Sequence, residues 1–397
     1  MKEVVVVSAA RTPFGKFGGG LMPLSASDLG GMAIKEALKR ANITGEQVNE
    51  VVYGVVVSAG QGQIPGRQAA IKGGIPHNVP VVTINKVCAS ALKAVTMGAQ
   101  MIKSGDADVV VAGGMESMTN MPYLTQNMRW GARMGDVSIK DTMLTDGLWC
   151  PENNVHMAVI GGSVSPDYTV TREMQDEWAL RSQQKWAEGE SKGIFDDERF
   201  SVEVPGKKGS ITISKDEAPR PETTKEALAK LKPLFIKDGS ITAGNAPGTN
   251  DGATAIILMS REKAKELGAP ILAVLRDHAQ VSEESRYIST VPGLAMKKLM
   301  KRNNLTLDNF DLIEVNEAFA AVTLVSCLGI LGMDKETMDK KVNVNGGAIA
   351  VGHPIGATGA RILMTLIYEL KRSGKKSGIV AICSGMAQGD AVWLEVE

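Results

Sequence analysis

The sequence predicts an α/β protein in which buried strands lie between layers of helices. Short apolar runs alternate with segments of helical periodicity throughout the 397-residue chain. Such runs are typical of buried strands, and strands that alternate with helices are typical of α/β layering. A weak internal repeat and a polar segment between its two copies add the expectation of two similar halves with an insertion.

Seven short apolar runs are the predicted strands. Their residues are 4–7, 81–87, 109–112, 271–275, 312–315, 342–344 and 379–382. A helix is expected to begin at or next to Cys88 and to reach residue 104, because apolar residues recur there at the spacing of one helix face. A second helix is expected over residues 171–192.

The internal repeat pairs two segments from opposite ends of the chain. These are SGDADVVVAGGM at residues 104–115 and SGKKSGIVAICSGM at residues 373–386. Each follows a helical stretch, with Cys88 and Ala357 at equivalent distances before them. If the halves are duplicates, their loops could face one cleft; a chance match is the alternative. We predict an N-terminal domain (1–119 and 249–270), a loop domain (120–248) and a C-terminal domain (271–397).

The composition excludes several classes of function. Forty-four basic residues balance 44 acidic ones, so no global field attracts nucleic acid or an anionic membrane surface. The longest apolar stretch is shorter than the roughly 20 residues that a membrane span needs. The four cysteines form no CxxC pair, which argues against a zinc site or a disulfide framework and suits a reducing compartment. We therefore expect a cytoplasmic protein without a metal.

Cys88 is the first candidate for a reactive group. It follows the strand-like run VPVVTINKV and stands at the expected start of a helix. The positive end of a helix dipole favours thiolate over thiol, so we expect a reactive sulfur at neutral pH. The alternative is a small buried apolar residue, a common role for a lone cysteine.

His353 is the second candidate. It stands among five glycines and a proline in NGGAIAVGHPIGATGAR, residues 345–361. Glycines at this density let the backbone approach a ligand closely. Of the four histidines it is the best placed to act as a base with a pKa near neutrality, and a purely structural turn is the alternative.

Two further residues follow predicted strands. Cys383 lies in AICSGMAQGDA, where a core cysteine is the plain reading. Asn316 lies in VNEAFAA, where it could equally cap the next helix.

Together these segments resemble the thiolase family. The matching motifs are SAARTPFGKF, CASALKAV from Cys88, AGGMESM, TAGNAPGTNDGA, NEAFA from Asn316, GGAIAVGHPIGATGAR and CSGMAQG from Cys383. Their order and spacing run from about residue 3 to the C-terminus. The resemblance implies a thiolase-like fold, with two similar α/β halves in a layered αβαβα core and an inserted loop domain.

The resemblance also implies roles for five residues. Cys88 would take the acyl group as a thioester, and His353 would activate it. Cys383 would exchange the proton of the acetyl methyl group. Asn316 would hold a water that forms one oxyanion hole with His353, and the N–H groups of Cys88 and Gly385 would form the other.

The substrate-binding residues implied by the resemblance lie in or near the loop domain. They are His156, Met157, Arg220, Phe235, Ala246 and Phe319. His156 and Met157 resemble the pattern of enzymes for short acyl groups. A surface arginine and a core phenylalanine are the plain alternatives for Arg220 and Phe235.

The sequence departs from the family pattern in three places. Pro247 stands where serine is common, which removes a hydroxyl and a backbone donor. Met386 and Ala387 stand where glycines are usual, which puts the shape of the acyl pocket in doubt. Ala91 replaces a frequent glycine, a change that a helix accepts.

The predicted function is that of an acetyl-CoA C-acetyltransferase. It would interconvert two acetyl-CoA with acetoacetyl-CoA and CoA by ping-pong chemistry through acetyl-Cys88, with CoA thioesters as substrates and no cofactor. A 3-ketoacyl-CoA thiolase of broader chain length and a noncatalytic acyl-CoA or lipid-binding relative are the alternatives. The resemblance further implies a dimer or tetramer; we expect a homotetramer, with residues 120–133 available for contacts.

Overall fold

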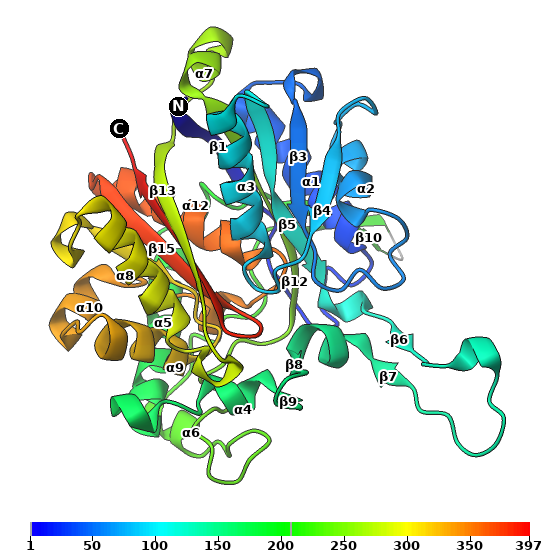
Figure 1. Cartoon of the computed structure of the whole chain (residues 1–397), viewed down its shortest axis with the longest axis vertical. Coiled ribbons are helices and arrows are strands. Elements are labelled where there is room, and N and C mark those ends of the chain that lie inside the picture. Colours follow the sequence, from blue (N-terminus) through cyan, green and yellow to red (C-terminus); the bar gives the residue numbers. More distant parts are fainter. Residues whose placement is uncertain (1, 207–208) are drawn as a thin grey trace.

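The structure is a computed structural model that describes residues 2–206 and 209–397. Its centre is a ten-stranded sheet, in which nine strands follow one path and β2 (Gly15–Lys16) pairs with β12 (Figure 1). Along the path the strands are β14 (Leu312–Val315), β15 (Ser377–Ser384), β16 (Gln388–Glu395), β13 (Ala273–Ser282), β1 (Val4–Arg11), β12 (Asn250–Ser260), β5 (Val109–Ser117), β3 (Glu50–Gly54) and β4 (Val81–Ile84).

The two ends of this sheet repeat one pairing pattern. β3 lies parallel to β5, and β5, β12 and β1 follow one another in antiparallel pairs. In the other half β14 lies parallel to β15, and β15, β16 and β13 continue in antiparallel pairs. Antiparallel pairing of β1 with β13 joins the halves. The prediction of two similar α/β halves is confirmed.

The layers follow from the alternation of side chains along each strand. On β1, Val5 and Val7 face one apolar cluster, whereas Val4 and Val6 face another. On β15, Val380 and Ile382 face the same cluster as Val4 and Val6, whereas Ile379 and Ala381 face a third. Because side chains of a strand alternate between faces, each half buries both faces of its sheet.

Helices separate and cover these sheet faces. α3 (Ser90–Ser104) and α12 (Thr358–Ser373) pack against each other in the shared central cluster. α1 (Ala26–Ala41) and α2 (Pro65–Lys72) cover the outer face of the N-terminal half, and α8 (Val291–Asn303) covers that of the C-terminal half. Gly359 lets the two central helices meet, because a Cβ there would lie 2.6 Å from the backbone nitrogen of Leu92.

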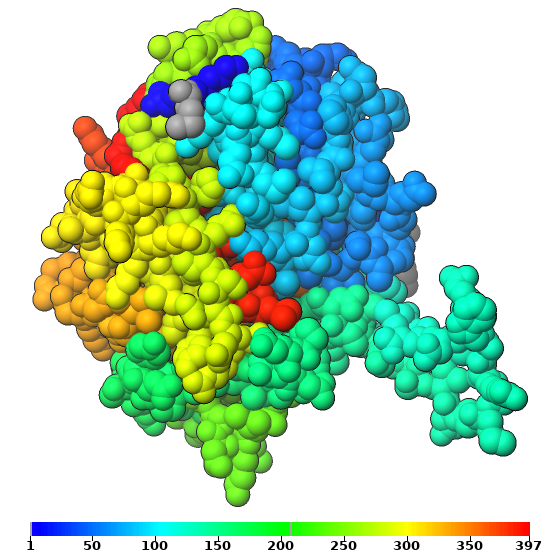
Figure 2. Space-filling model, in the orientation of Figure 1, coloured from blue at the N-terminus to red at the C-terminus, as the bar shows by residue number. Residues whose placement is uncertain are grey.

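Residues 120–248 include most of the lower part of the molecule in Figure 1 and a protruding arm, and one stretch of them, residues 202–206, packs against the N-terminal half. Their elements are β6 (Tyr123–Leu124), β7 (Lys140–Asp141), β8 (Trp149–Cys150), β9 (Val155–His156), α4 (Met157–Gly161), α5 (Arg172–Ser191), β10 (Val202–Gly206), β11 (Gly209–Ile213) and α6 (Lys225–Ala229). The helix expected over residues 171–192 is α5, capped by Thr171. The arm, residues 121–141, carries β6 and β7 and stands away from the body (Figure 2).

The remaining helices are short. They are α7 (Arg261–Leu267), α9 (Ala320–Leu324), α10 (Lys335–Lys341) and α11 (Ala348–Val351). No helix in the described part of the chain is both long and apolar enough to cross a bilayer.

Two strand predictions need correction. The run 342–344 is not a strand of the sheet, because it makes only isolated parallel bridges, Val342 with Ile313 and Val344 with Gly346. The strand predicted over 81–87 ends at Ile84, because residues 85–89 form the turn that enters α3.

Candidate active site

A cavity of about 200 Å³ gathers residues from both halves and from the loop segment. Nine of the eleven residues predicted to form the site line this cavity. They are Cys88, His353, Cys383, Gly385, His156, Met157, Phe235, Ala246 and Phe319. Asn316 and Arg220 are not among its lining residues. Segments separated by almost 300 residues of chain thus meet at one apolar cleft.

Cys88 lies on a turn that the surrounding backbone holds in a strained shape. Val87, just before it, has φ 43°, a conformation that a β-branched residue rarely adopts. The N–H of Val87 donates to Asn85 Oδ1 (2.8 Å), and the Ser90 hydroxyl donates to the carbonyl of Val87 (2.7 Å). Backbone strain that is held by such bonds is typical of functional sites. Here the strained turn places Cys88, the residue after Val87, at the cavity.

The protonation of Cys88 differs from the sequence expectation. Burial, with a smaller contribution from the nearby Glu116 carboxyl group, raises the pKa of its thiol to about 12. The stabilisation of a thiolate that we expected from the start of α3 does not offset this desolvation, because an ion in an apolar site loses its hydration. Before substrate binds, Cys88 is a thiol.

His353 lies in the loop between α11 and α12 and is held at two points. Its backbone N–H donates to Asn250 Oδ1 (2.9 Å), and its Nδ1 lies 2.7 Å from the Thr358 hydroxyl. Its Nε2 makes no hydrogen bond within the described residues. One ring nitrogen is therefore fixed by the protein, and the other is left for chemistry in the cavity.

The pKa of His353 is also displaced from the neutral value expected from sequence. Burial, with a smaller contribution from the positive charge of Arg361, lowers the pKa of His353 to about 3. The imidazole is therefore neutral at physiological pH, which leaves a lone pair to accept a proton.

Cys383 lies near the end of β15 and is only 1% exposed. Burial raises the pKa of its thiol well above the ordinary value, and a charge on Cys88 raises it further. That electrostatic effect on Cys383 requires the two sulfurs to lie near each other.

The turn after Cys383 contacts the turn before Cys88. The Ser384 hydroxyl donates to the carbonyl of Lys86, and Lys86 Nζ lies 2.7 Å from a carboxylate oxygen of Asp390 on β16. Gly385 allows the approach, because a Cβ there would lie 3.0 Å from Val87 Cγ2. These contacts hold the two sulfur-bearing loops together.

The unusual residues Met386 and Ala387 both have positive φ, 58° and 48°. Met386 is 46% exposed and does not line the cavity, so it leaves the acyl pocket unaltered. Ala387 is buried and packs in the same apolar cluster as Cys383 and Ile288. Of the two departures, only Ala387 contributes to the surroundings of the second sulfur.

Asn316 is fully buried just beyond β14. Its backbone N–H donates to the carbonyl of Ala381 (2.9 Å), and neither polar atom of its side chain has a partner in the described part of the chain. It does not cap the next helix, because α9 begins at Ala320 with Phe319 as its N-cap residue. A buried amide without a partner costs free energy, which favours a polar role for it.

His156 and Phe235 form one wall of the cavity. Their rings stack with centroids 4.0 Å apart, and Phe235 is 61% exposed rather than a core residue. His156 Nδ1 accepts from the N–H of Ala158 (3.1 Å), and burial lowers the pKa of His156. Met157, the first residue of α4, follows His156 in the chain and lines the same cavity.

The other predicted binding residues divide between the cavity and the surface. Ala246 and Phe319 line the cavity, and so does Pro247. Arg220 is exposed, and its guanidinium lies 3.4 Å from the carbonyl of Ala243, outside the cavity wall.

Glu116 is a site residue that the sequence does not single out, although it lies in the motif AGGMESM. Its buried carboxyl accepts from the N–H groups of Val56 (3.0 Å) and Val57 (3.2 Å) and from that of Gly356 in the His353 loop. Burial raises the pKa of Glu116 to about 8. Glu116 thereby connects the end of β5 to the loop that carries His353.

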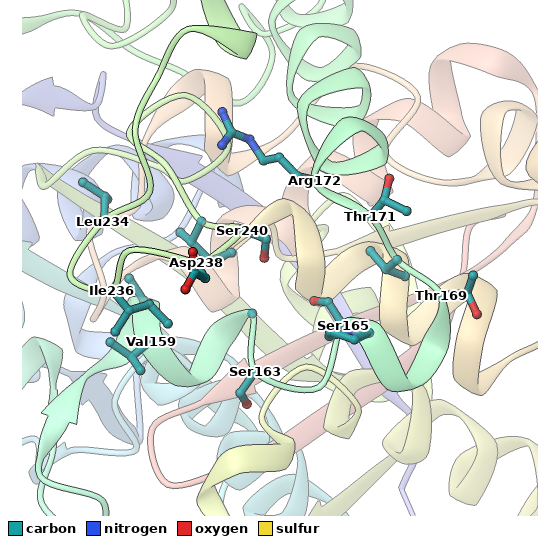
Figure 3. Close-up of a pocket in the computed structure, with 16 residues that line it drawn as sticks. Val159, Ser163, Ser165, Thr169, Thr171, Arg172, Leu234, Ile236, Asp238 and Ser240 are labelled. Carbon is teal, nitrogen blue, oxygen red and sulfur yellow. The ribbon is translucent and has the colours of Figure 1, made fainter.

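Figure 3 shows a larger pocket of about 570 Å³. It shares Ala158 and Leu234 with the cavity but contains none of the predicted catalytic residues. In the figure Arg172 lies at its edge, and that guanidinium is already bound to Asp176 (2.8 Å) and to the carbonyls of Leu228 and Leu231 (both 3.0 Å). Among the described residues, no group of three or more His, Cys, Asp or Glu could hold a metal ion.

Comparisons with known proteins agree with this geometry. The model of the thiolase N-terminal domain matches residues 4–262, and that of the thiolase C-terminal domain matches residues 269–396. An acetyl-CoA acetyltransferase of Cupriavidus necator is 47% identical over 396 residues, covering 100% of both chains. A probable acetyl-CoA acyltransferase of Staphylococcus epidermidis is 44% identical over 98% of both chains.

A solved structure gives the same answer for the fold. The crystal structure of the Bacillus anthracis acetyl-CoA acetyltransferase superposes with a TM-score of 0.96 at 38% identity, covering 100% of this chain and 99% of that one. Matches to both domain models account for nearly the whole sequence. This chain belongs to the thiolase family.

Proposed function

We propose that this thiolase interconverts two acetyl-CoA with acetoacetyl-CoA and CoA, through an acetyl group carried on Cys88. The observation that carries the proposal is the meeting of Cys88, His353 and Cys383 at one apolar cavity. Relatives named acetyl-CoA acetyltransferase support the choice of acetyl transfer.

In the cleavage direction, the first half-reaction forms acetyl-Cys88. His353 Nε2 takes the thiol proton of Cys88, and the thiolate attacks the keto carbon of acetoacetyl-CoA. The carbon–carbon bond breaks, its electron pair forms the enolate of acetyl-CoA, and Cys383 gives its proton to the enolate carbon. His353 is then an imidazolium and Cys383 a thiolate.

The second half-reaction restores both groups. CoA gives its thiol proton to Cys383, and the CoA thiolate attacks the acetyl carbonyl. The carbon–sulfur bond to Cys88 breaks, and Cys88 takes its proton back from His353. Each thiol and the imidazole regain their starting forms, and synthesis is the same sequence in reverse.

Negative charge develops on a substrate oxygen in both half-reactions. The backbone N–H groups of Cys88 and Gly385 would serve the carbonyl oxygen of the acyl group that is bound to Cys88. His353 Nε2, with a water held by Asn316, would serve the thioester oxygen of the enolate. The orphaned amide of Asn316 and the orphaned Nε2 support this second role. Donors that are already oriented stabilise such charge strongly, because no reorganisation is needed.

The low pKa of His353 and the high pKa of Cys88 affect the timing of the first step. A thiolate–imidazolium pair is disfavoured before substrate arrives. Proton transfer should therefore accompany attack on the carbonyl rather than precede it.

The test is cleavage of acetoacetyl-CoA in the presence of CoA by wild type and Cys88→Ser. We expect the variant to lose activity by about 10⁴-fold or more, because a serine is a much poorer nucleophile in this setting. Equal rates would remove Cys88 from the proposal, and a wild type without cleavage activity would favour a noncatalytic binder. Comparison of C4 with longer 3-ketoacyl-CoA substrates separates the broader-chain alternative, which predicts higher kcat/KM for the longer chains.

We also propose a homotetramer, supported by two uncovered surfaces. The arm exposes Trp130 by 86% and Met134 by 96%, and β4 is an edge strand with half-buried side chains. Apolar arms and open strand edges are typical of protein interfaces, and two different two-fold contacts generate a tetramer. Light scattering should give four chains for wild type and two for Trp130→Ser/Met134→Ser; a wild type of one or two chains would contradict the proposal.

All four cysteines are free thiols: Cys88, Cys150, Cys327 and Cys383. Free thiols support a reducing compartment, and we propose the cytoplasm as the location. The predicted domain boundaries likewise stay a prediction.

A further inference from the structure

The Thr358 hydroxyl stands between two groups of the His353 loop. Its Oγ1 lies 2.7 Å from His353 Nδ1 and 2.9 Å from the carbonyl oxygen of Pro354. Thr358 is the first residue of α12 and is fully buried, so the hydroxyl has no access to bulk water. Both contacts must be satisfied by its one proton and its lone pairs.

Counting donors fixes the direction of each bond. A carbonyl oxygen can only accept, so the hydroxyl proton is directed to Pro354. The lone pairs of Oγ1 then face Nδ1, and this contact is favourable only when Nδ1 carries a proton that it donates. In a neutral imidazole the other nitrogen, Nε2, is then unprotonated.

The free nitrogen is on the reactive side of the ring. Nε2 makes no hydrogen bond within residues 2–206 and 209–397, and His353 lines the cavity with Cys88. The opposite tautomer would present an N–H to the cavity and set a lone pair of Nδ1 against the lone pairs of Oγ1. That form could not accept a proton from Cys88 at Nε2.

We propose that Thr358 is a positioning residue that holds His353 in the Nδ1–H tautomer, so that Nε2 is the base facing Cys88. The same bond persists when Nε2 takes a proton, since Nδ1 still donates to Oγ1 in the imidazolium. Thr358 therefore supports both states of the ring without changing its own bonds. The catalytic meaning of this tautomer rests on the proposed function, whereas the tautomer itself does not.

The chain offers a favourable direct measurement. Only four histidines are present, His77, His156, His278 and His353, so selective ¹⁵N-histidine labelling gives a simple spectrum. The His353→Asn variant identifies the His353 signals by their loss. In wild type we expect an N–H at Nδ1 and a bare nitrogen at Nε2. A wild-type spectrum with the proton on Nε2 would overturn the proposal.

Two substitutions test the hydroxyl. Thr358→Val keeps the branched shape but removes the hydroxyl, and Thr358→Ser keeps the hydroxyl. We expect Thr358→Val to lose the single Nδ1–H form and to lower kcat by about 10- to 100-fold with little change in KM, a smaller loss than that caused by a wrong tautomer in serine proteases. Thr358→Ser should retain the tautomer and most of kcat.

The outcomes separate the two proposals. A Thr358→Val enzyme with the wild-type tautomer and kcat would overturn the role of Thr358. If Thr358→Val does not fold, wild type and Thr358→Ser still decide the tautomer. If the tautomer is as stated but acetyl-CoA leaves Cys88 unmodified, the proposed function fails and the positioning of the ring stands.

Discussion

The two halves of the molecule place different chemistry at equivalent points of one scaffold. The turn before α3 carries the thiol of Cys88, whereas the loop before α12 carries the imidazole of His353. The end of β5 carries the buried carboxyl of Glu116, whereas the end of β15 carries the thiol of Cys383. The duplicated strands and helices thus position the functional side chains, and the residues that differ between the loops provide the groups for the chemistry.

The two thiols extend this comparison. Burial keeps both of them un-ionised, but they differ in their exposure at the cavity. Cys88 is partly exposed at the cavity, and Cys383 is buried. The proposed mechanism gives them successive tasks, nucleophile and proton carrier, so removing one should not equal removing the other.

Cys383→Ala should have the largest effect among the predictions that divide the two halves. We expect condensation of acetyl-CoA to fall by about 10³-fold, within the range for loss of a general base. Exchange of labelled CoA into acetyl-CoA should fall much less, because it needs no proton transfer to or from carbon and solvent can replace Cys383 as the acceptor of the CoA thiol proton. Equal losses in condensation and exchange would contradict the assignment of separate tasks to the two thiols.

Asn316→Ala should lower turnover by about 100-fold, the usual cost of one oriented donor at a developing oxyanion. The effect should appear in condensation and spare the exchange of CoA, because Asn316 is assigned to the enolate. Steady-state rates of both reactions measure this. Asn345→Ala is the control, because that amide binds Glu369 (2.6 Å) instead of facing the site unpaired. A variant with full condensation activity would leave the buried amide without a catalytic role.

The pH dependence of Cys88 alkylation tests the desolvated state of the first thiol. A thiol whose pKa is raised to about 12 is un-ionised near neutrality, and its thiolate fraction rises with pH. The rate of modification by iodoacetamide should therefore rise about tenfold per pH unit between about pH 6 and pH 9 in the free enzyme. A plateau in that range would restore the sequence expectation of a stable thiolate.

Met386→Gly should have the smallest effect. Its positive φ suits glycine, and its side chain is outside the cavity, so we expect stabilisation of about 0.5–1 kcal/mol and unchanged kcat. Denaturant unfolding and steady-state kinetics check this. A changed preference for acyl chain length would mean that Met386 reaches the substrate after all.

The sequence is sufficient to predict the fold class and most of the residues that meet at the cavity. Strand periodicity and the order of short motifs are local properties of the chain, so they identify Cys88, His353 and Cys383. The pKa values of these residues cannot be predicted in the same way, because desolvation depends on groups brought together from both halves. The helix dipole favours a thiolate at Cys88, and burial reverses that expectation.

Other features depend on neighbours that the sequence does not name. The apolar run 342–344 makes only one bridge to β14, so it forms no strand of the sheet despite its composition. Met386 occupies a glycine position but faces solvent, which only the geometry of the β15–β16 turn reveals. Glu116 and Thr358 lie inside recognisable motifs, but their roles follow from hydrogen bonds to the His353 loop and ring.

The most direct test of the central claim is to locate the acetyl group after the enzyme meets acetyl-CoA. Wild type and Cys383→Ala are treated with acetyl-CoA, digested, and their cysteine peptides analysed by mass spectrometry. The proposed mechanism predicts acetylation of Cys88 alone, persisting longest in Cys383→Ala. Acetyl groups on Cys150, Cys327 or Cys383, or an unmodified Cys88 in both proteins, would contradict it.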